Sequence, residues 1–157
     1  AHLSSWPDEI LNKIIDVTKD GGKTLLLSDM TTEDIDLLNQ NHNFENNIEA
    51  HWTTGANEFS LHYLPKDSPL MAVFGGNGVL DHNSASAMPG ISLNELAGAK
   101  VYARSVTLKD GEIKTGVDLQ LVPFGKGQIM FNQFSVIEGL ETNALSDALF
   151  TAIVNLL

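Results

Sequence analysis

The most suggestive chemical feature of the sequence is a lysine between two glycines, Gly125-Lys126-Gly127, within the segment LVPFGKGQIMFNQFSV. A phosphate-binding loop needs a strand, a glycine-rich turn that ends in Lys and Ser or Thr, and a helix whose N-terminus faces the anion. Here a second apolar run comes directly after the lysine. The pattern therefore predicts a tight turn between two strands, with Gly125 or Gly127 at positive φ, and no phosphate site.

A second group of reactive side chains lies in a segment rich in Gly, Ser and Asn. Ser84 or Ser86, together with His82 and an acid such as Asp81, would supply the parts of a small serine hydrolase. The sequence has no GxSxG motif, and residues this close along a chain rarely converge in space. A surface loop is the favoured interpretation of this segment, and a hydrolase is the alternative.

Aromatic side chains beside polar ones suggest a sugar-binding surface. His51 and Trp52 are adjacent, and Trp6 lies in a second polar stretch. A tryptophan ring offers a broad apolar face with a polar edge. We take Trp52, His51 and Trp6 as candidate sugar-binding residues. The interpretation that the sequence favours for Trp52 is that it is partly buried and only packs, and sugar stacking is the alternative.

Metal, thiol and cofactor chemistry has no support in the sequence. The five histidines show no HxH or HExxH spacing, and the chain contains no cysteine. The acidic run TTEDID at residues 31–36 is typical of a solvated helix face, and no pair among the twenty acids can be placed as catalytic carboxylates. We predict no catalytic residue, no metal site and no cofactor.

The charge balance limits the classes of partner. The net charge is −11, and the nine basic residues are scattered, which argues against nucleic acid. No apolar run approaches the roughly 20 residues that span a bilayer, so no membrane partner is predicted. The acidity and the lack of cysteine slightly favour an extracellular or periplasmic setting, and they also fit a cytoplasmic one.

The elements that would position these residues form an α/β pattern. A chain of 157 residues suits a single domain over residues 1–157. Apolar residues at helical spacing, with capping residues before them, predict three helices. Short apolar or alternating runs predict five strands, the first of them a buried parallel strand. The predicted helices are 4–20, 31–41 and 141–157, and the strands are 23–29, 58–64, 99–108, 113–123 and 127–134.

Turns and loops complete this outline. Asp110-Gly111 predicts a hairpin between the third and fourth strands. Residues 42–57 are expected to be mostly loop, and 65–90 a long connection with short ordered pieces. The closing helix is expected to be capped near Thr142 or Asn143. Together the elements favour a layered α/β sheet.

Three blocks of the sequence carry a family resemblance: IIDVTKDGGKTLLLSD (14–29), YLPKDSPLMAVF (63–74), and the stretch from LVPFGKGQ to the final AIVNLL (121–157). They resemble class I glutamine amidotransferase-like domains, particularly those at the ends of β-galactosidase-like glycoside hydrolases. The resemblance implies a three-layer flavodoxin-like sandwich with a mostly parallel sheet and an antiparallel hairpin. It also implies that the Lys126 turn leads the last strand into the sheet.

The resemblance further implies a non-catalytic role. Such domains generally lack the amidotransferase nucleophile, and the catalytic acids of the parent enzyme lie in another domain, commonly a TIM barrel. The family's first strand, helix and second strand have no counterpart ahead of residues 4–20, so we expect a sheet incomplete at the N-terminus and a chain that is a C-terminal fragment.

The leading hypothesis is therefore an accessory domain of a carbohydrate-active enzyme, with a role in assembly or in the architecture of the substrate cleft. Its expected partners are the remaining domains of the parent enzyme, another protein chain or a second copy in a homo-oligomer, and an oligosaccharide. The alternatives are a carbohydrate-binding module that uses Trp52, and the small serine hydrolase.

Overall fold

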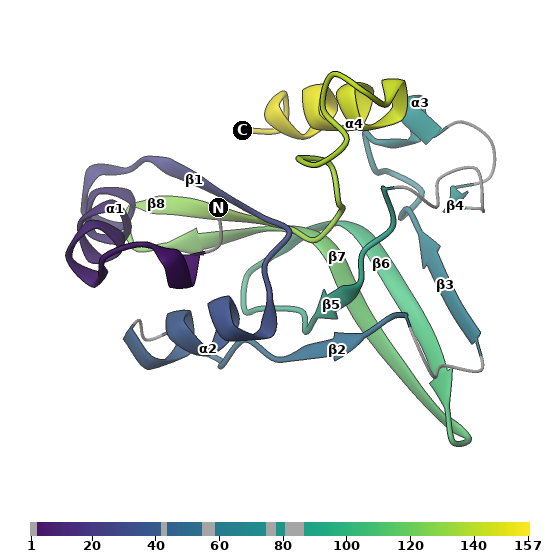
Figure 1. Ribbon diagram of the computed structural model, residues 1–157, viewed down its shortest axis with the longest axis horizontal. Helices are drawn as coiled ribbons and strands as arrows, with labels where there is room; N and C mark the ends of the chain where they lie inside the picture. Colours follow the sequence, from purple (N-terminus) through teal and green to yellow (C-terminus); the bar gives the residue numbers. More distant parts are fainter. Residues whose placement is uncertain (1–2, 42–43, 55–58, 75–77, 81–86) are drawn as a thin grey trace.

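The computed structural model describes residues 3–41, 44–54, 59–74, 78–80 and 87–157 (Figure 1). Within these ranges the chain forms four α-helices, one 3-10 helix and eight strands. In chain order the elements are η1 (Leu3–Ser5), α1 (Asp8–Gly21), β1 (Thr24–Ser28), α2 (Thr32–Asn41), β2 (Ala50–Trp52), β3 (Phe59–Tyr63), α3 (Met71–Phe74), β4 (Val79–Leu80), β5 (Ile91–Leu93), β6 (Lys100–Lys109), β7 (Glu112–Phe124), β8 (Gly127–Asn132) and α4 (Ala144–Val154).

The strands form one open, mixed sheet in the order β1-β8-β7-β6-β3-β4, and β5 joins it by pairing with both β7 and β2. Among the described strands only β1 and β8 run parallel. The predicted α/β class is confirmed, but the prediction of a mostly parallel sheet is wrong. Tight hairpins join β6 to β7 and β7 to β8, and a two-residue turn can connect only antiparallel neighbours. The flavodoxin-like arrangement is not confirmed.

Both predicted hairpin turns are present. Asp110 and Gly111 have φ values of 51° and 77°, as a turn matched to the right-handed twist of its strands requires. Gly125 has φ 61°, and the flanking residues Phe124 and Gly127 pair across β7 and β8. The lysine at 126 therefore belongs to a two-residue turn, as the sequence predicts.

Most predicted elements are confirmed, with ends that differ by a few residues. The predicted strand 23–29 is β1, and it is the parallel strand. The predicted helix 141–157 is α4, where the side chain of Asn143 accepts a hydrogen bond from the backbone N–H of Leu145. The expectation that residues 42–57 are mostly loop agrees with the described part of this range, where the short strand β2 is the one regular element.

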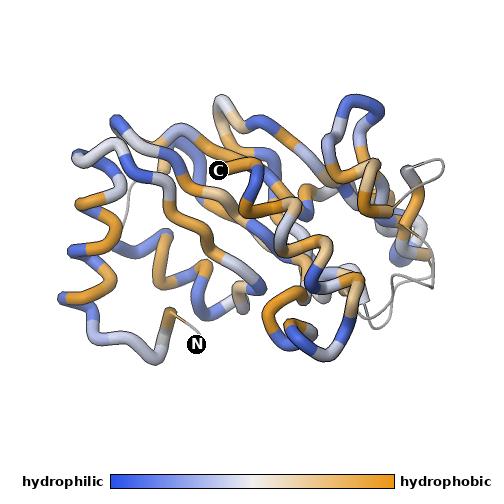
Figure 2. The backbone as a smooth tube through the Cα atoms, turned by 90° about the horizontal axis from the view of Figure 1, so that it is seen from above, coloured by the Kyte–Doolittle hydropathy of each residue, from blue (hydrophilic) through white to orange (hydrophobic). Residues whose placement is uncertain are grey.

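Helices cover the two faces of the sheet at different places (Figure 1). The first apolar core joins residues of α1 and α2 to Leu27 of β1 and to Ile129 and Phe131 of β8. The second joins α4 to Met130 of β8 and Leu119 of β7. Alternate residues of β8 thus enter opposite cores, so this strand is buried on both faces. Figure 2 shows that hydrophilic and hydrophobic residues are interspersed along the chain.

The glycines of the Gly125-Lys126-Gly127 turn allow the hairpin to contact the end of α1. The backbone N–H of Lys126 donates to the carbonyl oxygen of Lys19 at 2.7 Å. A β-carbon on Gly127 would overlap the carbonyl oxygens of Thr18 and Lys23, and one on Gly125 would lie 2.7 Å from the Lys19 oxygen. The two glycines thus allow the backbone of the hairpin to pack closely against the backbone at the end of α1.

We expect Gly127→Ala to destabilise the fold by about 1–3 kcal/mol, because the added methyl group has no space between two carbonyl oxygens. Urea denaturation followed by circular dichroism measures this loss. Gly90→Ala is the control, since a β-carbon at Gly90 meets nothing within 4 Å. Equal midpoints for the two variants would contradict this account of the turn.

Candidate functional site

A buried polar cluster lies where β5 crosses the middle of β7. Asp118 of β7 is fully buried, and both of its carboxylate oxygens accept hydrogen bonds. The Ser92 hydroxyl of β5 donates to Oδ1, and Nδ1 of His62 on β3 lies 2.9 Å from Oδ2. Ser105 of β6 donates to the Ser92 oxygen at 2.7 Å. The cluster therefore links four strands, three of them directly through the Asp118 carboxylate.

The cluster contains Ser, His and Asp but does not have the arrangement of a catalytic triad. In a triad the histidine lies between serine and aspartate and accepts the serine proton. Here Asp118 lies between Ser92 and His62, so the hydroxyl donates to the carboxylate and not to the histidine. Ser92 is also fully buried and out of reach of a substrate. The arrangement acts as a structural clamp.

His51 of β2 lies against the same crossing. A β-carbon on Gly116 would overlap the His51 ring and lie 2.7 Å from the Ser92 β-carbon, so only glycine allows β2 and β5 to pass this close to β7. The Nε2 atom of His51 is buried and has no hydrogen-bond partner among the described residues. Burial lowers the pKa of His51, while the Asp118 carboxylate raises it and Lys114 lowers it further.

Trp52, the next residue of β2, is largely exposed. The residue retains 63% of its accessible surface, so Trp52 is partly buried and much of it faces solvent. The strand position is fixed by pairing with Ile91, and the backbone N–H of Thr53 donates to the carbonyl oxygen of Gly90 at 3.0 Å. A short but firmly held strand therefore presents the indole to solvent.

Two cavities meet at Trp52. One, of about 490 Å³, lies between β2 and the β6–β7 hairpin, and the other, of about 330 Å³, lies toward the start of α2. His51 lines the first cavity, so two of the predicted sugar-binding residues share one site. The first cavity is also lined by Ala50, Thr107, Lys109, Asp110, Glu112 and Lys114, and the second by Asp29, Met30, Thr31, Thr32, Glu33, Gly90 and Ile91.

Trp6 does not line either cavity at Trp52. It is 38% exposed and borders a separate, mostly apolar cavity of about 150 Å³ with residues such as Leu3 and Leu11. Grouping Trp6 with the other two residues is therefore wrong, because the chain places it beside α1 and β1 instead of β2. The hydrolase candidates Asp81, His82, Ser84 and Ser86 lie outside the described residues.

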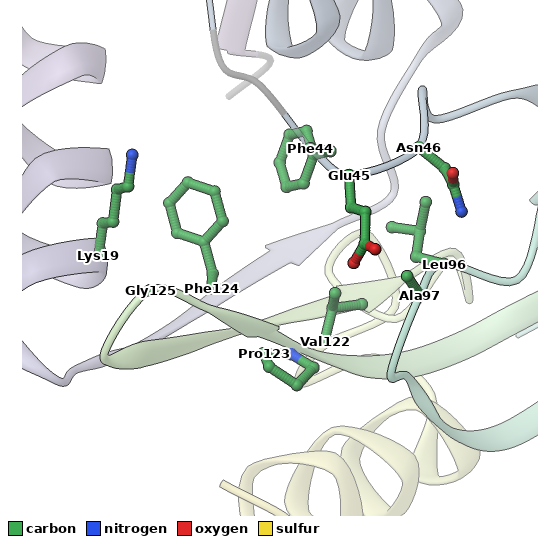
Figure 3. A pocket seen from close by; sticks show the side chains of 10 residues that line it. All are labelled: Lys19, Phe44, Glu45, Asn46, Leu96, Ala97, Val122, Pro123, Phe124 and Gly125. Carbon is green, nitrogen blue, oxygen red and sulfur yellow. The ribbon is translucent and has the colours of Figure 1, made fainter.

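A further cavity, of about 190 Å³, borders the Gly125 turn (Figure 3). The lysine that lines it is Lys19 of α1, whose ammonium group lies 5.8 Å from the centre of the Phe124 ring. Phe44 packs against Phe124 with ring centres 5.3 Å apart. Lys126 does not line this cavity, so the cavity gives no indication that the Lys126 side chain binds an anion.

The described ranges contain neither a metal-binding cluster nor a membrane helix. No three His, Asp or Glu side chains of those ranges are grouped so that they could hold a metal ion. Over the same ranges, every helix is too short or too polar to traverse a bilayer. Comparison of the chain with protein-family models, with curated proteins and with solved structures finds no match.

The Asp118 cluster is a feature that reasoning from the sequence missed. A signal is present, because Asp118 lies between the apolar residues Val117 and Leu119 of a predicted strand, and a carboxylate that is buried in a strand requires hydrogen-bond partners. The identity of those partners carries no sequence signal. His62, Ser92 and Ser105 come from three other strands, and only the strand pairing brings them together.

Asp118→Ala should destabilise the protein strongly, because it removes the acceptor for both Ser92 and His62. Each buried donor left unpaired costs about 1–3 kcal/mol. Chemical denaturation measures the change, with Asp16→Ala on the exposed side of α1 as the control, for which a change within about 0.5 kcal/mol is expected. A small effect of Asp118→Ala would show that the clamp contributes little.

Protonation of His51 should oppose folding in mild acid. Because burial holds its pKa in the folded state below its usual value, the unfolded chain takes up the proton first. The stability that neutral His51 contributes is complete above about pH 6.5 and is lost as the pH falls below that value. Thermal melts at about pH 8 and about pH 5 should show a smaller decrease in melting temperature for His51→Gln than for the wild type. Equal decreases for the two proteins would contradict a lowered pKa of His51 in the folded state.

Proposed function

We propose that this chain is a non-catalytic accessory domain of a carbohydrate-active enzyme, and that it forms part of a saccharide-binding cleft with the surface around Trp52. The observation that supports this most directly is the exposed indole at the junction of two cavities. The resemblance to glutamine amidotransferase-like domains of glycoside hydrolases agrees with such a role. The proposal does not depend on a flavodoxin-like topology.

The form of the surface suits an extended ligand. A sugar ring stacks on a flat aromatic face through its C–H groups, while its hydroxyls need donors and acceptors at the rim. The cavity toward α2 offers acceptors from Asp29 and Glu33, and the other cavity offers donors from Lys109 and Lys114. A chain of sugars that crosses Trp52 would reach both cavities.

Support for a non-catalytic role comes from the buried cluster. Hydrolysis by a serine nucleophile requires an exposed hydroxyl next to a base. Within the described residues, the Ser–His–Asp grouping around Asp118 is closed and wrongly ordered for this reaction. The small serine hydrolase that uses Ser84 or Ser86 with His82 stays a separate hypothesis, and labelling with an active-serine phosphonate probe tests it.

Trp52→Ala should abolish oligosaccharide binding, because it removes the large aromatic face that borders both cavities. Truncation of a central tryptophan typically costs about 2 kcal/mol or more, which is about thirtyfold in Kd. Isothermal titration calorimetry against neutral, amino and acidic oligosaccharides measures the change. A wild-type chain that binds none of these sugar classes would contradict the proposal.

The matched control is Trp6→Phe. Trp6 lies at another cavity, so its replacement should leave affinity unchanged. Because the chain has two tryptophans, this variant also leaves Trp52 as the sole indole. Its fluorescence should then shift on ligand binding. Binding without any change in this signal would place the sugar away from Trp52.

A further inference from the structure

The cavity between β2 and the β6–β7 hairpin is bordered by a row of polar side chains. Ser60, Thr107 and Lys114 lie directly opposite one another across β3, β6 and β7, so their side chains share one face of the sheet. Thr107 is buried, and it lines the cavity together with Lys114. His51 covers the neighbouring position Gly116. We call Ser60, Thr107 and Lys114 the polar row.

Two polar atoms beside this cavity are buried without a partner. Neither Oγ of Ser60 nor Nε2 of His51 has a hydrogen-bond partner among the described residues. Most buried polar side-chain atoms in proteins are hydrogen-bonded, and an unpaired one lowers stability. The polar row therefore keeps hydrogen-bonding capacity that the fold does not use.

Lys114 adds a positive charge at the end of the polar row. Its side chain is exposed, and it takes part in no ion pair of the described residues. Burial is the largest cause of the lowered pKa of His51, and the charge of Lys114 lowers that pKa further. The ammonium group of Lys114 therefore acts at the end of the cavity where His51 lies.

The acids of this cavity lie at the hairpin turn. Asp110 belongs to the turn, and Glu112 lies directly opposite Lys109. Lys114 is one row farther from the turn, and the residue opposite it is the uncharged Thr107. Two lysines and two acids give this cavity a balanced formal charge, whereas the chain as a whole carries −11. A negatively charged group is therefore tolerated best beside Lys114.

The cavity on the other side of Trp52 has a different charge. Asp29 and Glu33 line it, and none of the described residues around it is basic. Hydrogen bonding, chiefly with the backbone at the start of α2, lowers the pKa of Glu33 and keeps this carboxylate ionised at neutral pH. An anionic sugar would be repelled here. A saccharide that crosses Trp52 with an acidic group at one end would therefore bind in one orientation.

We propose that the cavity between β2 and the β6–β7 hairpin is a subsite for an acidic sugar residue, whose carboxylate or sulfate group binds Lys114 and the hydroxyls of the polar row. This inference rests on the proposed saccharide-binding function and specifies the class of saccharide. The sugar ring stacks on Trp52, which lines the same cavity, and the acidic group extends toward Thr107. The cavity volume of about 490 Å³ suits a small ligand, since such sites measure about 300–1,000 Å³.

Isothermal titration calorimetry with matched tetrasaccharides of glucose, galactose and mannose tests the proposal, each in neutral, C6-carboxylated and C6-sulfated form. The wild type should bind an acidic form about tenfold more tightly than the matched neutral form, because an ammonium group forms a charge-assisted hydrogen bond with the acid. The acidic form that binds more tightly identifies the anion.

Two variants test the assigned residues. Lys114→Met should weaken binding of the acidic form about tenfold and leave binding of the neutral form unchanged. Thr107→Val has the same shape without the hydroxyl, and it should weaken binding of the acidic form about fivefold. Circular dichroism checks that each variant is folded.

Lys13→Met is the matched control, because Lys13 is exposed on α1 and lines a different cavity. It changes the net charge of the chain by the same amount and should leave every affinity unchanged. Equal binding of neutral and acidic forms by the wild type would overturn the acidic subsite and leave the proposed function standing. Binding of none of these saccharides would overturn both. A preference for the acidic form that survives Lys114→Met would overturn the assignment of the subsite.

Discussion

The crossing of β5 over the middle of β7 is the contact on which the described architecture depends. Gly116 lets His51 and Ser92 approach the β7 backbone, and two residues later along β7 the Asp118 carboxylate joins Ser92 and His62. A carboxylate removed from water at this point is tolerated because both of its oxygens accept hydrogen bonds. The crossing also determines the position of β2, because this three-residue strand pairs with β5.

Because of this crossing, the two sides of the β6–β7 hairpin have different surroundings. Covering the polar side with β2 creates the cavity beneath Trp52 and leaves the indole at its border. The apolar side keeps no helix of the described chain over its outer end. One side of the hairpin therefore lines the cavity beside Trp52, and the other side carries the exposed side chains of Phe59 and Ile113.

The Gly125-Lys126-Gly127 turn has residue types that also occur in phosphate-binding loops, but here these residues allow the turn to pack against the end of α1. Its glycines are required because backbone carbonyls at the end of α1 lie where β-carbons would be. The lysine between them contributes its backbone N–H to Lys19 instead of a side chain to a ligand. This turn leads into the strand β8, whereas a phosphate loop leads into a helix whose N-terminus faces the anion.

The sequence by itself determined the longer helices and strands and both hairpins, because helical periodicity, caps and the Asp110-Gly111 and Gly125 turns are local signals, but it did not predict the short strands β2 and β5. It also marked Trp52 and His51. Only the tertiary structure decided which strands became neighbours, and thus the mostly antiparallel sheet, the partners of Asp118, the separation of Trp6 from Trp52, and the outward turn of Phe59 and Ile113. These features depend on contacts between residues distant along the chain, which no local pattern of residue types encodes.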